Sequence, residues 1–183
     1  MNLYVLRHAS AGTRRPNPLI DAKRPLDKEG KQQCILIAGA LNALNIHFDV
    51  IASSPLKRAL QTASFVGTEM GNDTKILTTK ALSPEAAIAD FHKLVGDLSG
   101  HENVLVVGHN PNLQHFLSSV ISCLNPSAAS LPNRANVRLR KGSIARVDCT
   151  RRPATLNWLI DARMLRTLYT SVTKSSRRKT SRK

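Results

Sequence analysis

Histidines and arginines follow closely on three short apolar segments of the sequence. They are Arg7 and His8 after residues 2–6, Arg58 after 49–52, and His109 after 103–107. A guanidinium group can bind two phosphate oxygens at once, and an imidazole nitrogen can act as a nucleophile. If the fold gathers these side chains, the pattern indicates chemistry on a phosphoryl group.

The elements between these residues predict how they are gathered. Apolar segments of strand length alternate with longer segments of helical periodicity, which is typical of a mostly parallel sheet covered on both faces. We therefore predict an α/β fold, a three-layer α/β/α sandwich with a mostly parallel central sheet. The carboxyl ends of parallel strands share one edge, where ligands bind. The four side chains should meet at that edge.

The periodicity also predicts the bounds of the elements. We expect strands over residues 2–6, 49–52, 75–79, 103–107, 137–147 and 154–160. We expect helices over 27–45, with Asp27 as its N-cap, and over 55–70, 84–98 and 111–124.

Two of these helices carry a start signal next to a strand end. Ser54-Pro55 and Asn110-Pro111 each place a polar residue before a proline, which is typical of an N-cap followed by the first helical residue. Helix N-termini carry unpaired N–H groups and a partial positive charge, and they favour phosphate. No glycine-rich nucleotide-binding loop accompanies them.

The composition bounds the number of domains and the kind of partner. The chain has 183 residues, a net charge of +15 and only 4% aromatic residues. We predict one domain over 1–164 and a basic, disordered C-terminal tail over 165–183. The charge suits an anionic ligand or an acidic protein partner. It also suits nucleic acid, but few aromatic side chains can stack on bases, so no specific nucleic-acid binding is predicted.

The compartment follows from what the sequence contains. No run of about eighteen apolar residues could cross a membrane, and the first residues do not form a signal peptide. Cys34, Cys123 and Cys149 lie far apart in apolar settings, which favours free thiols in a reducing compartment. We expect a cytoplasmic protein without a membrane partner.

Three segments resemble the signature segments of the histidine phosphatase superfamily, in the same order. They are Leu6-Arg7-His8-Ala9, residues 53–63 with the sequence SSPLKRALQTA, and residues 107–111 with the sequence VGHNP. Arg24-Pro25-Leu26 followed by Gly30 resembles the SixA-type branch, the phosphohistidine phosphatases. The likeness extends from Met1 to about Met164, and it implies a phosphoglycerate mutase-like fold.

The resemblance implies a role for each matching residue. His8 would be the nucleophile that takes the phosphoryl group, and Arg7, Arg58 and His109 would hold the phosphoryl oxygens. Arg24 and Asn110 would be additional substrate contacts. Neither a metal nor a cofactor is implied, and the sequence has no cluster of His, Asp and Glu that suggests a metal site.

The proton donor of the predicted site has two interpretations. The segment where family members that cleave esters carry an acid contains Glu85, expected in the first turn of a helix capped by Ser83. Glu85 is either a proton donor or an acid favoured there by the helix dipole. The segment resembles that of the SixA type, which lacks the usual acid.

The substrate predictions follow from this segment. The P–N bond of phosphohistidine has a better leaving group than an alkyl ester, so a phosphorylated protein of the histidine-phosphotransfer or phosphocarrier type is the leading substrate. A phosphatase for small phosphorylated molecules, such as a sugar phosphate, a nucleotide or polyphosphate, is the alternative. A non-catalytic, basic nucleic-acid-binding module is a further alternative.

Overall fold

A computed structural model describes residues 1–72, 75–122 and 135–180 of the chain, with side chains as far as residue 171. In these ranges the strands are β1 (Asn2–Arg7), β2 (Val50–Ser53), β3 (Leu77–Thr78), β4 (Asn103–Gly108), β5 (Ile144–Asp148) and β6 (Thr155–Ile160). They form one sheet in the order β3-β2-β4-β1-β5-β6. Neighbours among the first four are parallel, whereas β5 is antiparallel to both β1 and β6. The predicted mostly parallel sheet is confirmed.

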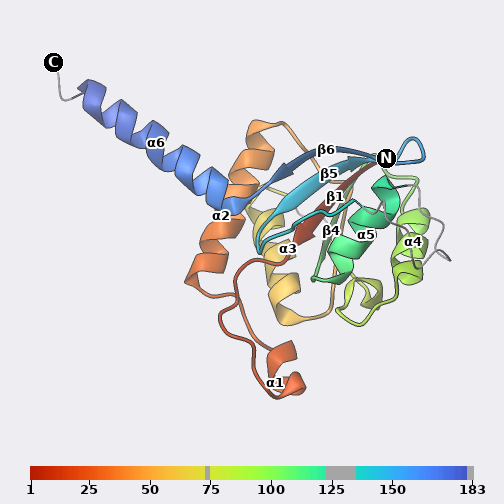
Figure 1. Cartoon of the computed structure of the whole chain (residues 1–183). Helices are drawn as coiled ribbons and strands as arrows, with labels where there is room; N and C mark the ends of the chain where they lie inside the picture. Colours follow the sequence, from red (N-terminus) through yellow and green to blue (C-terminus); the bar gives the residue numbers. More distant parts are fainter. Residues whose placement is uncertain (73–74, 123–134, 181–183) are drawn as a thin grey trace.

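The helices complete the three predicted layers. They are α1 (Pro18–Ala22), α2 (Lys28–Ala43), α3 (Lys57–Glu69), α4 (Ile88–Asp97), α5 (Asn112–Ile121) and α6 (Ala162–Thr180), with a short 3-10 helix η1 (Lys80–Leu82). In Figure 1, α2 and α3 cover one face of the sheet and α4 and α5 cover the other, while α1 lies beyond the end of β1. None of the helices that the structure describes is long and apolar enough to cross a membrane.

The two central strands explain why both faces are covered. Residues 3–6 of β1 are at most 2% exposed, and residues 104–107 of β4 are completely buried. Alternate side chains enter opposite clusters: Tyr4 and Leu6 pack with α2 and α3, whereas Leu3 and Val5 pack with α4 and α5. A strand that is apolar at every position needs an apolar layer on each side.

The strand register brings the three predicted junctions together. Arg7 at the end of β1 pairs with Gly108 at the end of β4, and Ser53 at the end of β2 pairs with Val107. The next residues along each strand, His8, Ser54 and His109, therefore leave the sheet at one edge. Backbone bonds continue the register, because His8 N–H donates to Gly108 O and Ser54 N–H donates to Val107 O.

The helix starts predicted from the two prolines are wrong. The structure begins α3 at Lys57 and α5 at Asn112, after caps at Leu56 and Pro111 that make no side-chain cap bond. The Ser54 hydroxyl lies instead against the ring of His109. By contrast, Asp27 caps α2 as predicted, accepting from the N–H of Gly30.

The helix predicted over 84–98 begins later, at Ile88, and its cap is Ala87 rather than Ser83. The side-chain amide of Asn112 donates to the carbonyls of Ser83, Pro84 and Ala86, which holds this stretch as a loop. Glu85 therefore lies on a loop and not in a first helical turn.

The strand predicted over 137–147 is shortened to β5, starting at Ile144. Gly142 has a φ of +70°, a left-handed conformation that breaks a strand, and its N–H lies against the carbonyls of Arg7 and His8. The side-chain donors of Arg7 and Asn110 occupy the carbonyl of Leu139. These side-chain and turn contacts replace strand pairing.

The structure describes α6 as a helix from Ala162 to Thr180, which includes most of the segment predicted as a basic, disordered tail. Its first turns pack on α2, where Leu165 contacts the core and Arg166 lies 3.9 Å from Glu29. Beyond these contacts α6 projects from the body (Figure 1). The division into a domain over 1–164 and a tail stays a prediction, and residues 123–134 lie outside the described parts.

Candidate active site

His8 lies at the carboxyl end of β1, and its side chain and backbone together are only 6% exposed. Its Nδ1 lies 2.8 Å from the carbonyl oxygen of Ala9. A carbonyl only accepts, so Nδ1 carries the ring hydrogen and Nε2 keeps its lone pair. Burial lowers the pKa of His8 to about 3, and the charges of Arg58 and Arg7 act in the same direction. The ring is therefore neutral at neutral pH and presents a free Nε2.

His109, at the carboxyl end of β4, is the second buried imidazole, with 2% of its surface exposed. Its ring centroid lies 5.0 Å from that of His8. Its Nε2 lies 2.8 Å from the hydroxyl of Ser54, whose oxygen also accepts from Leu56 N–H at 3.4 Å. The hydroxyl hydrogen is thus available to Nε2, and the ring hydrogen then lies on Nδ1. Burial lowers the pKa of His109 to about 2, so this ring is neutral as well.

Two guanidinium groups complete the charge of this region. Arg58 on α3 is 6% exposed, and its Nη1 donates to the backbone carbonyl of Asp21 at 3.0 Å. Arg7 donates from Nη1 to the carbonyl of Leu139 at 2.9 Å. Burial lowers the pKa of both groups from a value far above neutrality, so both remain charged.

Polar atoms without a partner gather at the same place. Six buried side-chain nitrogens and oxygens of the described residues have no hydrogen-bond partner, and four of them are Arg7 Nε, Arg58 Nε, His109 Nδ1 and Asn110 Oδ1. Leaving such an atom unpaired costs about 1–3 kcal/mol. Three of the four are N–H donors, which is what the oxygens of a phosphoryl group would pair with.

Asp21 on α1 forms ion pairs with both Arg24 and Arg58, and the sequence analysis did not identify it. Its Oδ2 lies 3.3 Å from Arg58 Nη1, and its Oδ1 accepts from Arg24 Nε at 2.8 Å. The pKa of Asp21 is lowered, mainly by the hydrogen bond from the backbone N–H of Arg15. Burial raises this pKa, but Arg24 and Arg58 lower it further. Asp21 is the only acid before Asp27 in the sequence, a signal that could have singled it out.

The two residues predicted as additional substrate contacts are partly engaged elsewhere. The guanidinium of Arg24 donates to Asp21 and, through Nη1, to the carbonyls of Ala11 and Gly12. Asn110 donates from Nδ2 to the carbonyl of Leu139, which leaves its Oδ1 as the unpartnered atom. Arg24 is thus linked to Arg58 by their shared partner Asp21. Asn110 follows His109 directly in the sequence.

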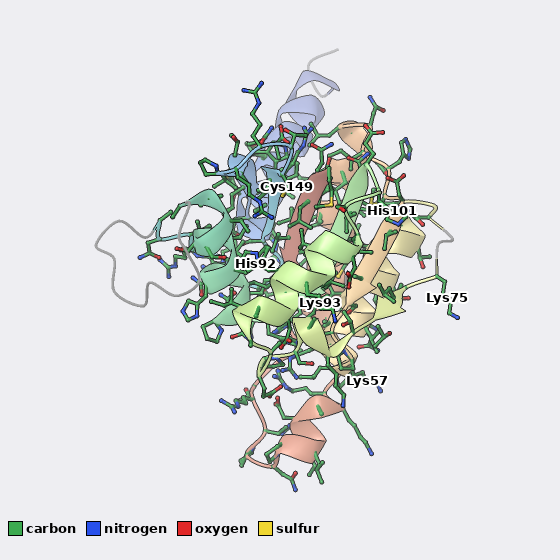
Figure 2. The ribbon with its side chains drawn as sticks, turned by 90° about the vertical axis from the view of Figure 1, so that its right-hand side faces the viewer. Lys57, Lys75, His92, Lys93, His101 and Cys149 are labelled. Carbon is green, nitrogen blue, oxygen red and sulfur yellow. The ribbon has the colours of Figure 1, made fainter. Side chains whose placement is uncertain are left out.

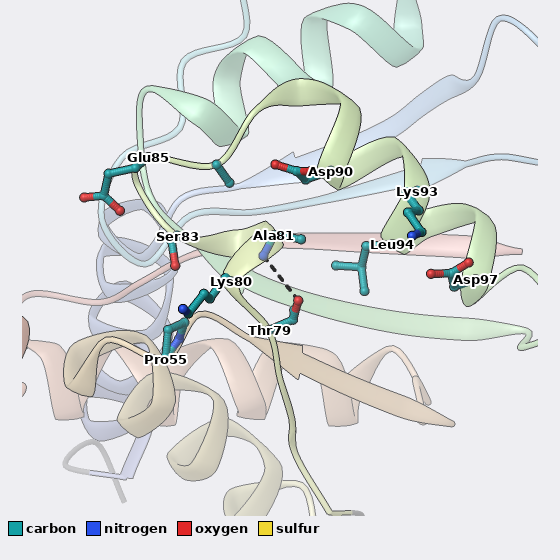
Figure 3. A pocket seen from close by; sticks show the side chains of 11 residues that line it. Pro55, Thr79, Lys80, Ala81, Ser83, Glu85, Asp90, Lys93, Leu94 and Asp97 are labelled. Carbon is teal, nitrogen blue, oxygen red and sulfur yellow. Dashed lines mark hydrogen bonds between the residues drawn. The ribbon is translucent and has the colours of Figure 1, made fainter.

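A cavity of about 640 Å³ lies beside η1 and α4, and neither His8 nor His109 is among its lining residues. Pro55, next to Ser54, and Ser83 line it, and Figure 3 shows Glu85 at its rim with the carboxylate directed away from Asp90 and Asp97. Glu85 is exposed, yet its charge raises the pKa of Arg58 against the stronger effect of burial. The carboxylate is therefore close enough to Arg58 to interact with it.

Two of the other four histidines, His92 and His101, lie away from this edge. His92 sits on α4, bonded to Ser119 at 3.1 Å, and His101 precedes β4 at the opposite end of that strand. Figure 2 shows both above the level of Lys57 and α1. Neither adjoins the residues gathered at the carboxyl ends of the strands.

A sequence model for "Histidine phosphatase superfamily (branch 1)" matches residues 3–94, half of the chain. The chain belongs to the histidine phosphatase superfamily. Membership supports phosphatase activity for this chain. The match includes His8, Arg24, Arg58 and Glu85 and ends before His109.

Known relatives of this histidine phosphatase agree with the fold. An uncharacterized protein of Picosynechococcus is 28% identical over 146 residues, which cover 78% of this chain and 87% of that protein. The solved structure of the protein histidine phosphatase SixA with tungstate is similar with a TM-score of 0.75 and 22% identity, covering 90% of this chain and 99% of that one. The α-ribazole phosphatase from Shigella flexneri is similar with a TM-score of 0.67 and 16% identity, covering 88% and 97%. The predicted phosphoglycerate mutase-like fold is confirmed.

Proposed function

We propose that this histidine phosphatase hydrolyses the P–N bond of protein phosphohistidine through a phosphohistidine intermediate on His8. The observation that carries the proposal is the neutral His8 ring, whose Nδ1 is bonded to Ala9 while Nε2 is free. Similarity in fold to a protein named a protein histidine phosphatase supports it. The substrate would be a histidine-phosphotransfer or phosphocarrier protein of the cytoplasm.

In the first step, the lone pair of His8 Nε2 forms a bond to phosphorus. The P–N bond to the substrate imidazole breaks, and its electron pair stays on the departing nitrogen. Negative charge spreads over the phosphoryl oxygens, where Arg7, Arg58 and His109 Nδ1–H stabilise it. Removing one such donor typically costs about 3 kcal/mol in the transition state. These fixed charges lead us to propose a reaction that uses no metal.

The leaving group needs little help. A phosphohistidine ring that carries a hydrogen on its other nitrogen departs as neutral imidazole, which is a stable species near neutral pH. In the second step water attacks phosphorus, the electron pair returns to His8 Nε2, and both water protons stay on the released phosphate. Neither step requires the carboxylate of Glu85, consistent with its exposed position on a loop.

Turnover of a phosphohistidine peptide beside a panel of sugar phosphates, nucleotides and polyphosphate tests the substrate. If turnover of a substrate with a labelled phosphoryl group is quenched without acid, the label should be found on His8. His8→Ala should abolish turnover and trapping, whereas His115→Ala, an exposed histidine on α5, should change neither. Wild-type turnover by His8→Ala would overturn the mechanism.

A phosphatase for small esters is the second candidate, and one observation favours it. The cavity of about 640 Å³ has Glu85 at its rim, so an ester could place its departing oxygen near a carboxyl group. Faster turnover of esters than of phosphohistidine, combined with a crippled Glu85→Gln variant, would favour this candidate.

A further inference from the structure

A second cavity, of about 360 Å³, shares Arg7 with the candidate active site. Its lining is strongly basic: besides Arg7 it contains Arg138, Arg140, Lys141 and Arg163, against the single acid Glu29. None of the residues lining it is apolar or aromatic. We refer to Arg138, Lys141 and Arg163 as the basic groove.

The described residues do not neutralise the positive charge of the basic groove. Arg140 lies 3.5 Å from Asp161, and Glu29 lies 3.9 Å from Arg166, so these neighbours are already paired. Among the side chains that the structure describes, no carboxylate pairs with the three groove residues. The groove therefore has a surplus of cations available to an external anion.

The segment that carries two of these cations is fixed by the candidate active site itself. Val137 and Leu139 are buried in the core, so Arg138 between them is turned outward. Arg7 Nη1 and Asn110 Nδ2 donate to the same carbonyl, that of Leu139, at 2.9 and 2.8 Å. The groove thus has a defined position relative to the phosphoryl-binding side chains.

The charge of the groove also acts on the site. Lys141 lowers the pKa of His8, as a smaller effect than burial, and it lowers the pKa of Asp27 as well. A cation that acts on His8 lies close enough for one extended ligand to occupy the groove and the phosphoryl site together.

We propose that the basic groove binds carboxylate side chains of an acidic polypeptide segment next to the phosphohistidine of the substrate protein. The inference rests on the proposed function and adds the part of the partner that is recognised. Carboxylates pair with guanidinium and ammonium groups, and an acidic partner is steered toward a protein of net charge +15. Nucleic acid fits less well, because the groove offers no aromatic side chain for stacking.

Binding of a fluorescein-labelled, glutamate-rich peptide without phosphate tests the groove independently of activity. In Arg138→Ala/Lys141→Ala/Arg163→Ala, loss of three exposed ion pairs should weaken binding by about tenfold. The matched control is Lys75→Ala/Arg151→Ala/Arg152→Ala, which removes the same charge from exposed positions near the opposite end of the strands. It should bind as wild type does. Equal weakening in both triple variants, or in neither, overturns the proposal.

Turnover separates the two proposals. For a phosphohistidine peptide with acidic flanks, the groove variant should raise KM about tenfold and leave kcat unchanged, with no effect for glutamine flanks. If neither the acidic nor the glutamine-flanked peptide is hydrolysed, the proposed function is wrong. The groove proposal is then tested by the peptide-binding experiment alone. If both are hydrolysed without dependence on the groove, the groove proposal fails alone. A groove that loses tripolyphosphate binding but not peptide binding also overturns it.

Discussion

His8 and His109 face each other across the carboxyl ends of β1 and β4, with ring centroids 5.0 Å apart and planes inclined by 51°. Each ring is held by one nitrogen: His8 through Nδ1 by the carbonyl of Ala9, and His109 through Nε2 by the hydroxyl of Ser54. The remaining nitrogens differ in character, because one keeps a lone pair and the other carries the ring hydrogen. In the proposed mechanism this difference would suit His8 for attack on phosphorus and His109 for stabilising the phosphoryl oxygens.

The depressed pKa values of the two histidines predict a loss of stability in mild acid. Both are neutral in the folded protein, with pKa values of about 3 and about 2, whereas an unfolded histidine titrates near 6.5. Below pH 6.5 both histidines bind a proton in the unfolded state but stay neutral in the folded state. The free energy of unfolding should fall by about 1.4 kcal/mol per pH unit for each histidine.

Urea unfolding between pH 7 and pH 5 measures this slope, in a range where carboxylates contribute little. His109→Gln should reduce the slope by about 1.4 kcal/mol per pH unit, because its proton is no longer taken up on unfolding, while His8 and His92, whose pKa burial also lowers, still contribute. His101→Gln, at an exposed position, should leave it unchanged. An unfolding free energy that stays flat over this range contradicts the assignment of two neutral rings.

The Ser54 hydroxyl is predicted to set the tautomer of His109. Ser54→Ala removes the donor to Nε2, so the ring hydrogen can move to Nε2 and Nδ1 then turns a lone pair toward the phosphoryl oxygens. We expect kcat/KM to fall by about tenfold or more, in line with the loss of one oriented donor. Nitrogen NMR of the histidine ring should show the change of tautomer directly.

The chain contains a matched control for this prediction. Ser119 also bonds to a histidine Nε2, that of His92, at 3.1 Å and away from the strand ends, but its hydroxyl donates to the carbonyl of Phe116 and therefore accepts from the ring. Ser119→Ala should alter the His92 signals and leave kcat/KM as in wild type. Equal kinetic effects of the two substitutions would show that Ser54 acts through general stability.

The sequence was sufficient for the sheet edge because it depends on patterns that are local. Apolar runs such as residues 103–107 are long enough to identify a buried strand, and a parallel sheet then places the following residues together. Once the two central strands are identified, their parallel pairing places Arg7 beside Gly108.

The missed features depend on contacts between distant residues. The Ser54 hydroxyl bonds to His109, 55 positions away, so its cap signal was misread. Asp21 belongs to α1, a helix of one turn whose periodicity is too short to detect, and its partner Arg58 is 37 positions away. Residues 137–143 have a strand-like composition, but the side chains of Arg7 and Asn110, both far away in sequence, donate to the carbonyl of Leu139.

Asp21 is predicted to be a positioning residue for the arginines. In Asp21→Asn one carboxylate oxygen becomes an NH₂ group, so either Arg58 or the pair of Arg24 and the N–H of Arg15 faces a donor in place of its acceptor. We expect kcat/KM to fall by about 10- to 100-fold, the equivalent of one charge-assisted hydrogen bond. Inhibition by inorganic phosphate should weaken in parallel, since both depend on the oriented guanidinium groups.

Asp97→Asn is the control for the removed charge, because Asp97 is exposed at the end of α4 and lines the cavity near η1. It should change neither kcat/KM nor phosphate inhibition by more than about twofold. A drop in melting temperature for Asp21→Asn without weaker phosphate inhibition would mean that Asp21 supports only the fold of α1.

Gly30 is predicted to be irreplaceable because α2 approaches the loop after His8 too closely for a side chain. A Cβ at this position would lie 2.0 Å from the carbonyl oxygen of Ser10 and 2.9 Å from its carbon, both backbone atoms. Ser10 cannot simply withdraw, since its N–H donates to Gln33 and its hydroxyl to Asp27. Gly30→Ala should therefore destabilise the protein by about 1–3 kcal/mol, the usual cost of overpacking, and displace the His8 loop.

Gly39, on the same helix, is the matched control, because a methyl group added there would meet no atom within 4 Å. Gly39→Ala should stabilise α2 by up to about 1 kcal/mol through helix propensity alone. Thermal or urea unfolding of both variants, with kcat/KM measured beside it, separates the two effects. The structure requires Gly30→Ala to lose both stability and activity, and a Gly30→Ala protein as stable and active as Gly39→Ala would contradict the close approach of α2 to Ser10.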